Sequence, residues 1–186
     1  GKNFEEQVLA TNVDVVFIVT GLDHDFNVRR IERYLTAVAS LNARVVLILN
    51  KADLLTDKSQ IEVALQNLSG ISEILYTSAF EETDIQKVKG KILKEETAIF
   101  IGSSGVGKST LLNGLLGGEF QKTGAVREDD SRGRHTTTHR ELFVLDNDKF
   151  IIDTPGMREV ALCDSSDSLE NSFEDIENLM RQCKFK

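Results

Sequence analysis

Short runs of apolar, often β-branched residues alternate along the chain with segments whose apolar residues recur every three or four positions. The runs are typical of strands buried on both faces of a parallel sheet, and the recurring positions predict amphipathic helices. The predicted strands span 13–20, 44–49, 73–77 and 98–101. The predicted helices span 28–41, 58–69, 84–94 and 108–117. This alternation predicts an α/β fold with a doubly wound, mostly parallel sheet and right-handed crossovers.

The pattern changes after residue 117. Residues 118–140 are polar and show no period, and long stretches of this kind in compact domains are usually functional. Two more predicted strands, 141–146 and 149–153, flank Asn147-Asp148, which favours a tight hairpin turn. The segment 159–180 is rich in acidic residues and has no basic one. We expect a loop and an amphipathic helix with a solvated acidic face there, and a contact with a partner is the alternative.

Composition and charge limit the class of protein. Hydrophobic residues make up 40% of the chain and charged residues 28%, as in an ordinary globular domain, and the net charge of −8 argues against non-specific binding of RNA phosphates. No apolar run approaches the roughly 20 residues of a membrane span, and no signal peptide is evident. Two cysteines cannot form a disulfide framework, so we expect a cytoplasmic protein. Because the chain starts at Gly1, we also expect a piece of something longer.

A phosphate-binding loop is predicted between strand 98–101 and helix 108–117. The sequence GSSGVGKS fits G-x-x-x-x-G-K-[ST] in the strand-to-helix context that this motif requires. Glycines let backbone N–H groups point at phosphate oxygens, and a helix N-terminus favours an anion. Lys108 would bridge the β- and γ-phosphates and Ser109 would bind Mg²⁺, whereas the alternative is a glycine-rich turn with an exposed lysine. The expected nucleotide contacts here are Gly102, Ser103, Ser104, Gly105, Val106, Gly107, Lys108, Ser109 and Thr110.

A base-binding site is predicted from two segments that directly follow predicted strands, NKAD at 50–53 and TSA at 77–79. The carboxyl ends of parallel strands form the edge where α/β sheets bind ligands. The segments resemble the N-K-x-D and [ST]-S-A motifs of GTPases, in which the aspartate accepts two hydrogen bonds that guanine supplies and adenine cannot. The resemblance implies that Asp53 selects guanine, Lys51 lies along the base plane and Asn50 helps to fix the loop and the base. It also implies that the Ala79 N–H faces the guanine oxygen and that Ser78 belongs to the nucleotide-binding residues. The alternative for residues 50–53 is an Asx turn that ends a strand.

The order of the motifs is unusual, because GTPases generally carry the phosphate loop before the base motifs. The last helix of such a fold ends near the start of its first strand, so helix 84–94 can lead directly into strand 98–101 without changing the sheet. We therefore interpret the sequence as a circularly permuted GTPase.

The switch segments are expected in the last third of the chain. Asp153-Thr154-Pro155-Gly156 resembles the D-x-x-G motif, which implies Mg²⁺ near Asp153 and a γ-phosphate near the Gly156 N–H; the alternative is a strand-ending turn. Met157 follows where many GTPases have a glutamine that orients water, so hydrolysis by this domain alone should be slow. Residues 132–141 read RGRHTTTHRE. One of the threonines 136–138 should reach Mg²⁺, with Thr138 favoured over Thr137, and His135 or His139 could handle the attacking water, unless both are solvated loop residues.

Taken in order, NKAD, TSA, GSSGVGKST, GRHTTTHRE and DTPGM resemble the RsgA (YjeQ) family of circularly permuted GTPases that act on the small ribosomal subunit. The resemblance covers residues 8–186 and implies that His135 is the family's switch histidine implicated in hydrolysis. It also implies an RNA-binding OB-fold before this region and a zinc-binding domain after it. Cys183 would begin the zinc segment, but one cysteine cannot form a four-ligand site, so we expect no zinc here. Cys163 is expected to be a small core or loop residue.

These observations lead to a set of expectations. Residues 1–162 should form the GTPase domain, and 163–186 an acidic helical segment leading toward the zinc domain. We expect Mg²⁺-dependent GTP hydrolysis in late assembly of the small ribosomal subunit, slow in isolation and stimulated by that particle, with rRNA contacts mainly through the other domains and the chain itself a monomer. His135, Lys108 and Thr138 are the expected catalytic residues, and Ser109, Thr138 and Asp153 the expected Mg²⁺ ligands. The alternatives are a GTP/GDP-binding checkpoint module with negligible hydrolysis and an ATP-using P-loop enzyme.

Overall fold

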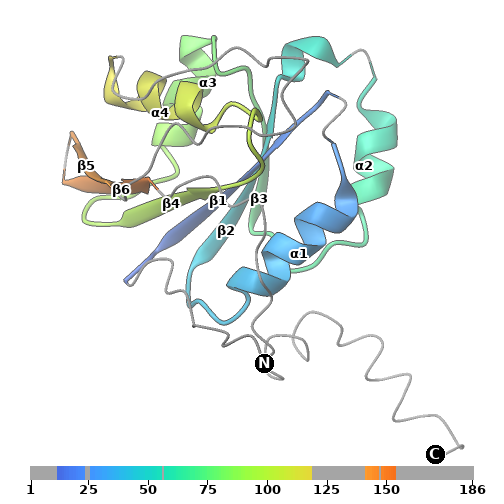
Figure 1. The fold of residues 1–186 in the computed structure, drawn as a ribbon, viewed down its shortest axis with the longest axis horizontal. Coiled ribbons are helices and arrows are strands. Elements are labelled where there is room, and N and C mark those ends of the chain that lie inside the picture. The colour runs from blue at the N-terminus through green and yellow to red at the C-terminus, as the bar shows by residue number, and fades with distance from the viewer. Residues whose placement is uncertain (1–11, 24–25, 56, 119–140, 147, 154–186) are drawn as a thin grey trace, which may run out of the picture.

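The fold is a six-stranded sheet between two layers of helices in a computed structural model that describes residues 12–23, 26–55, 57–118, 141–146 and 148–153 (Figure 1). The strand order is β3-β2-β1-β4-β6-β5, and every neighbouring pair is parallel except β5 and β6. The strands are β1 (Val15–Gly21), β2 (Arg44–Asn50), β3 (Glu73–Tyr76), β4 (Thr97–Ile101), β5 (Glu141–Leu145) and β6 (Lys149–Asp153). The predicted fold class is therefore confirmed.

The helices divide between the two faces of the sheet. They are α1 (Val28–Val38), α2 (Ser59–Leu65), α3 (Glu82–Lys89) and α4 (Lys108–Leu116), and a short 3₁₀ turn, η1 (Ala52–Leu54), follows β2. Apolar residues of α1 and α2 pack on one face, and those of α3 and α4 pack on the other. Figure 1 shows the same division, with α1 and α2 on one side of the strands and α3 and α4 on the other. The central strands are thus covered on both faces.

Burial explains why the central strands read as continuous apolar runs. All seven residues of β1 are buried, and so are all residues of β2 after Arg44. Phe17 of β1 and Phe100 of β4 stack with ring centroids 4.7 Å apart, and a pair of this kind adds about 0.5–1.5 kcal/mol beyond the area it buries. The core therefore lies along β1, β2 and β4, and two of these strands, β2 and β4, lead into predicted nucleotide-binding segments.

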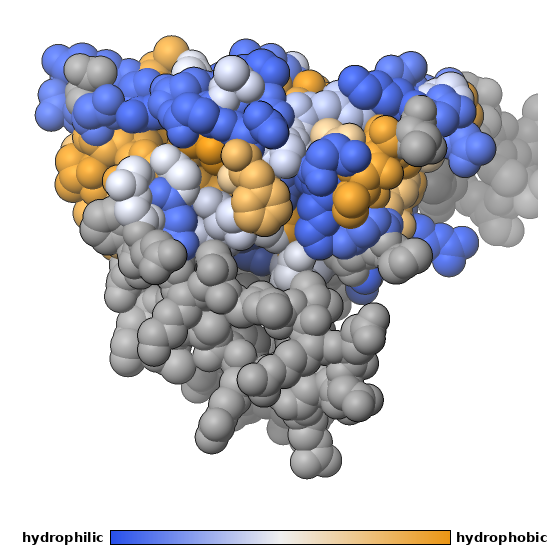
Figure 2. All heavy atoms as spheres, turned by 90° about the horizontal axis from the view of Figure 1, so that it is seen from above, coloured by the Kyte–Doolittle hydropathy of each residue, from blue (hydrophilic) through white to orange (hydrophobic). Residues whose placement is uncertain are grey.

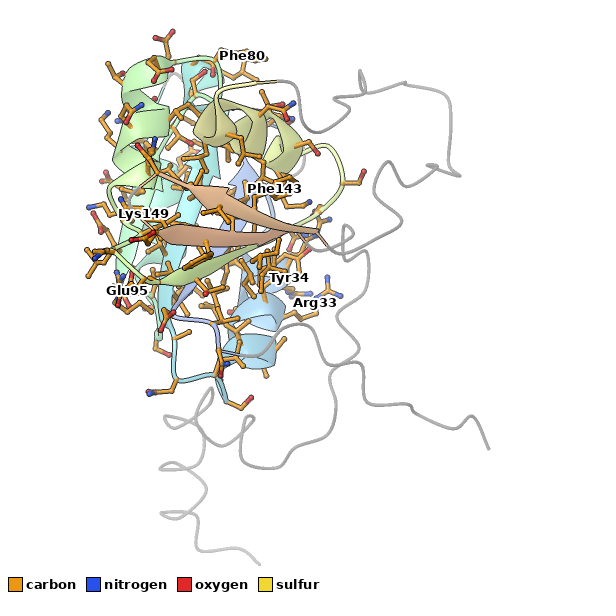
Figure 3. All side chains as sticks on the ribbon, turned by 90° about the vertical axis from the view of Figure 1, so that its left-hand side faces the viewer. Arg33, Tyr34, Phe80, Glu95, Phe143 and Lys149 are labelled. Atoms are coloured by element: carbon orange, nitrogen blue, oxygen red, sulfur yellow. The ribbon has the colours of Figure 1, made fainter. Side chains whose placement is uncertain are left out.

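Helix α1 shows how sequence pattern and local chemistry combine. The Asn27 side-chain oxygen accepts a hydrogen bond from the Arg30 backbone N–H at 3.1 Å and so caps the helix start. Figure 3 shows Tyr34 turned toward the sheet and Arg33 turned away from it, in agreement with a buried Tyr34 and an exposed Arg33. The helix ends at Val38, although the apolar pattern continues to the half-buried Leu41.

The β5–β6 hairpin is antiparallel, as predicted, with Leu145 opposite Lys149. Asp148 in the turn has φ 55°, a conformation that Asp adopts more readily than most residues. Strand β6 pairs in parallel with β4, with Ile99 opposite Ile152. The last residue of β6, Asp153, therefore lies beside the strand that enters the predicted phosphate loop.

The surface seen in Figure 2 mixes hydrophilic and hydrophobic side chains, with the hydrophobic ones in separate groups between hydrophilic ones. Among the described residues, no helix has both the length and the apolar character that a membrane crossing requires.

Candidate functional site

The predicted nucleotide-binding segments meet at one edge of the sheet. Residues 50–53 begin at the last residue of β2, residues 77–79 follow β3, and the glycine-rich loop 102–107 follows β4. Because these strands are parallel, their carboxyl ends lie at the same edge. The fold thus brings the phosphate loop, which begins at Gly102, together with base motifs that lie at 50–53 and 77–79 of the chain.

Asn50 connects these segments directly. Its side chain is buried, its Nδ2 donates a hydrogen bond to the Val106 carbonyl oxygen at 2.8 Å, and its Oδ1 accepts one from the Thr77 hydroxyl at 3.2 Å. The Asn50 backbone carbonyl also accepts a hydrogen bond from the Leu22 N–H at 2.8 Å. One amide side chain therefore joins the end of β2 to the phosphate loop and to the end of β3.

The rest of the first base motif lies nearer the surface. Lys51 adopts a left-handed backbone conformation with φ 61°, and its Nζ forms an ion pair with Asp23 Oδ2 at 2.5 Å. Both side chains of this pair are about one quarter exposed. Asp53 is exposed in η1, and a hydrogen bond at 2.9 Å joins the Ala52 N–H of this turn to the carbonyl of Thr77, the residue after β3. The Asp53 carboxylate is therefore accessible to a ligand.

The second base motif is hydrogen-bonded to α3. Ser78 is buried, and its backbone N–H donates to Asp84 Oδ2 at 2.9 Å, while Ala79 is half-buried. Asp84 also accepts a hydrogen bond from Lys87 Nζ at 2.6 Å. Burial raises the pKa of the Asp84 carboxyl, but the hydrogen bonds from Lys87 and Ser78 outweigh it and hold that pKa below its ordinary value. Sequence reasoning missed Asp84; an acidic residue in the first turn of a helix just after the motif was the available signal.

The phosphate loop has the backbone conformation that its glycines permit. Gly105 and Gly107 have φ angles of 81° and 97°, and α4 begins directly after Gly107. A Cβ on Gly107 would collide with Asn50 Nδ2, so only glycine fits there without displacing that side chain. Lys108 Nζ donates to the carbonyl oxygens of Gly102 at 2.7 Å and Ser103 at 2.5 Å. Its ammonium group thus lies over the start of the loop.

An arginine that sequence reasoning missed also contacts this loop. Arg30 Nη1 donates to Ser103 Oγ at 2.7 Å, across 73 positions of sequence. Asp23, the partner of Lys51, was missed as well. Both lie between β1 and the first turns of α1, in a segment that carries no recognisable nucleotide motif.

The expected metal and switch residues are only partly described. Ser109 and Thr110 lie half-buried in the first turn of α4, and Asp153 ends β6. Ser109 supplies a hydroxyl and Asp153 a carboxylate, and oxygen donors of this kind suit Mg²⁺. Across the part of the chain that the structure describes, no group of three or more His, Cys, Asp or Glu side chains could hold a metal ion. His135, Thr138, His139, Gly156, Met157, Cys163 and Cys183 lie outside the described residues.

Comparison with known proteins identifies the family, because the family model described as RsgA GTPase matches residues 1–163. The chain belongs to the RsgA GTPase family. A Vibrio vulnificus protein named small ribosomal subunit biogenesis GTPase RsgA 2 is 46% identical over all of this chain and 53% of its own length. A Methanosarcina acetivorans protein named small ribosomal subunit biogenesis GTPase RsgA is 44% identical over all of this chain and 50% of its own length. The chain therefore spans about half the length of the curated relatives that it matches.

Solved structures agree with the RsgA assignment. YjeQ from Thermotoga maritima is 28% identical with a TM-score of 0.58, over 78% of this chain and 49% of its own. A structure described as YloQ, a circularly permuted GTPase, has a TM-score of 0.66 at 22% identity, over 94% of this chain and 56% of its own, and supports the fold. The predicted family and the predicted permuted motif order are confirmed.

Proposed function

We propose that this chain is the nucleotide-hydrolysing domain of a GTPase that acts in late assembly of the small ribosomal subunit. The observation that carries the proposal is the Asn50 side chain, which hydrogen-bonds both the phosphate loop at Val106 and the second base segment at Thr77. Loops tied together in this way can hold the two ends of one nucleotide at a fixed separation. The names of the curated relatives supply the biological setting.

Guanine specificity follows from the base side of the site. Asp53 is exposed in a turn whose backbone is hydrogen-bonded to Thr77, just after β3, and its carboxylate would accept the two N–H groups of guanine. Adenine presents no such donor pair, and a site built for hydrogen bonds rejects ligands that leave it unmatched. Lys51 would lie along the base plane, and the Ala79 N–H would face the guanine oxygen. The ATP-using alternative is disfavoured by Asp53.

On the phosphate side, Lys108 and the backbone N–H groups of residues 102–110 would bind the phosphates. Ser109, Asp153 and Thr138 would hold Mg²⁺, which when bound neutralises charge on the β- and γ-phosphates. Gly156 would contact the γ-phosphate through its N–H, and His135 would orient the attacking water. Met157 cannot perform that role, so hydrolysis should be slow until the small subunit completes the site.

The remaining parts of the proposal concern the whole protein. It would act as a cytoplasmic monomer, with rRNA contacts largely through segments outside this acidic chain. Cys183 would contribute to a zinc site in a longer chain. A checkpoint module with negligible hydrolysis is a second candidate, which the methionine at position 157 favours.

The first test is competition for a fluorescent GDP analogue in the presence of Mg²⁺. We expect GTP and GDP to compete and ATP to fail, and Asp53→Asn to shift preference from GTP toward xanthosine triphosphate. Equal competition by ATP would contradict the guanine assignment. Single-turnover hydrolysis with and without small subunits then separates the enzyme from the checkpoint module, because only the enzyme should be accelerated.

A further inference from the structure

Two cationic side chains converge on Ser103, at the start of the phosphate loop. Arg30 Nη1 donates to the Ser103 hydroxyl at 2.7 Å, and Lys108 Nζ donates to the Ser103 carbonyl at 2.5 Å. Lys108 belongs to α4, whereas Arg30 belongs to α1 on the opposite face of the sheet. The loop is therefore approached by positive charge from both faces.

The position of Lys108 indicates which end of a nucleotide this region would meet. In loops of this kind the backbone N–H groups hold the α- and β-phosphates, while the lysine reaches the β- and γ-phosphates. The Lys108 ammonium donates hydrogen bonds to the carbonyls of Gly102 and Ser103. We therefore expect these residues to lie near the β- and γ-phosphates of a bound nucleotide. Arg30 donates a hydrogen bond to the Ser103 hydroxyl, so it lies in the same part of the loop.

We propose that Arg30 is a phosphate-binding residue that contacts the γ-phosphate and so favours GTP over GDP. This inference rests on the proposed function, because it requires a guanine nucleotide in the loop. A guanidinium offers a planar fork of donors that matches two phosphate oxygens, and it stays protonated at any physiological pH.

The nucleotide preference of Arg30 variants tests this role. We expect Arg30→Ala to weaken binding of a non-hydrolysable GTP analogue by about tenfold or more, as for loss of one charge-assisted hydrogen bond, and to change GDP binding by less than about threefold. Arg30→Lys should recover part of the loss because it keeps the charge without the fork. Arg29→Ala is the matched control, since Arg29 is an exposed arginine on the same helix.

The outcomes separate this inference from the proposed function. The cap of α1 uses the backbone N–H of residue 30, so Arg30→Ala keeps it, and thermal unfolding should match that of Arg29→Ala. If Arg30→Ala weakened the binding of GDP as much as the binding of the GTP analogue, Arg30 would only stabilise the conformation of the loop. The γ-phosphate role would then be wrong, while the GTPase proposal would stand. The γ-phosphate role would also be wrong if neither affinity changed. If the unaltered chain bound neither nucleotide, both proposals would fail.

Discussion

The base side and the phosphate side of the site are held in different ways. On the base side, Asn50, Thr77 and Ser78 are buried, and their hydrogen bonds join protein groups inside the fold. On the phosphate side, Lys108 and Arg30 are half-buried and bind oxygens at the start of the loop, where a phosphate could take over the same donors. We infer that base-side residues contribute to folding as well as binding, whereas the cations contribute mainly to affinity.

Replacement of Asn50 should have the largest effect. Asn50→Ala removes the partners of the Val106 carbonyl and the Thr77 hydroxyl, and each buried group left unpaired costs about 1–3 kcal/mol. We expect the free energy of unfolding to fall by about 3 kcal/mol and GDP binding to weaken with it. Urea denaturation and fluorescent GDP titration measure the two effects.

Asn67→Ala is the matched control for that experiment, because Asn67 is exposed and belongs to neither base motif. It should change the free energy of unfolding by no more than about 0.5 kcal/mol. If Asn50→Ala were as stable as Asn67→Ala, the base side would not be pre-organised by folding, and the contrast between the two halves would disappear.

Replacement of Lys108 should affect nucleotide affinity more than stability. Lys108→Met removes hydrogen bonds to two loop carbonyls that water can replace, so stability should change by less than about 1 kcal/mol. GTP affinity should fall by about tenfold to a hundredfold, the contribution of charge-assisted hydrogen bonds to phosphate. Lys94→Met, at an exposed lysine, provides the control. A loss of stability comparable to that of Asn50→Ala would show that the phosphate side is structural as well.

The sequence could predict the strands and the edge of the sheet where the motifs meet, because buried parallel strands read as apolar runs and their carboxyl ends share one edge. Helix ends were harder to place. Ile92 is fully buried and continues the apolar period of α3, yet the helix ends at Lys89. A side chain can pack in the core without being helical, so periodicity alone overextends a helix.

Long-range polar pairs could not be predicted. Arg30 with Ser103, and Asp23 with Lys51, join residues 73 and 28 positions apart, and no local pattern encodes such pairs. The hydrogen bond from Asn50 to the Val106 carbonyl also joins residues far apart in the sequence. The motifs predicted which residues belong to the site, but the contacts that position them depend on the packing of elements around the sheet.

A smaller effect is expected from the ion pair between Asp23 and Lys51. Asp23→Asn should leave stability nearly unchanged, because a partly exposed pair contributes about 0–1 kcal/mol. GDP should bind a few-fold more weakly, since Lys51, which we propose lies along the base, would lose its ion-pair partner. The difference should shrink as ionic strength rises. If Asp23→Asn left GDP affinity unchanged at every salt concentration, the ion pair would not contribute to GDP binding. Lys51 would then not belong to the part of the base side that folding pre-organises.

The smallest effect concerns Asp84, which accepts a hydrogen bond from the Ser78 N–H in the second base motif. Hydrogen bonds from Lys87 and Ser78 outweigh burial and lower the pKa of Asp84 in the folded chain. A carboxyl whose pKa is lower folded than unfolded adds stability above its unfolded pKa, and that stability is lost as the pH falls through the folded pKa. Because Lys87 is well exposed, solvent screening limits the contribution to under about 1 kcal/mol.

Asp84→Asn should therefore lower the free energy of unfolding slightly at neutral pH and reduce its dependence on pH below about pH 4. Asp57→Asn provides a matched comparison, because hydrogen bonds from Ser59 also lower the pKa of Asp57, but at an exposed residue that belongs to neither base motif. Both variants should flatten the acid limb of a urea-denaturation series, and only Asp84→Asn should also weaken GDP binding. Equal GDP affinity in the two variants would mean that the Ser78 segment keeps its position without Asp84, and that the buried link between Asn50 and Thr77 is enough to hold the base side.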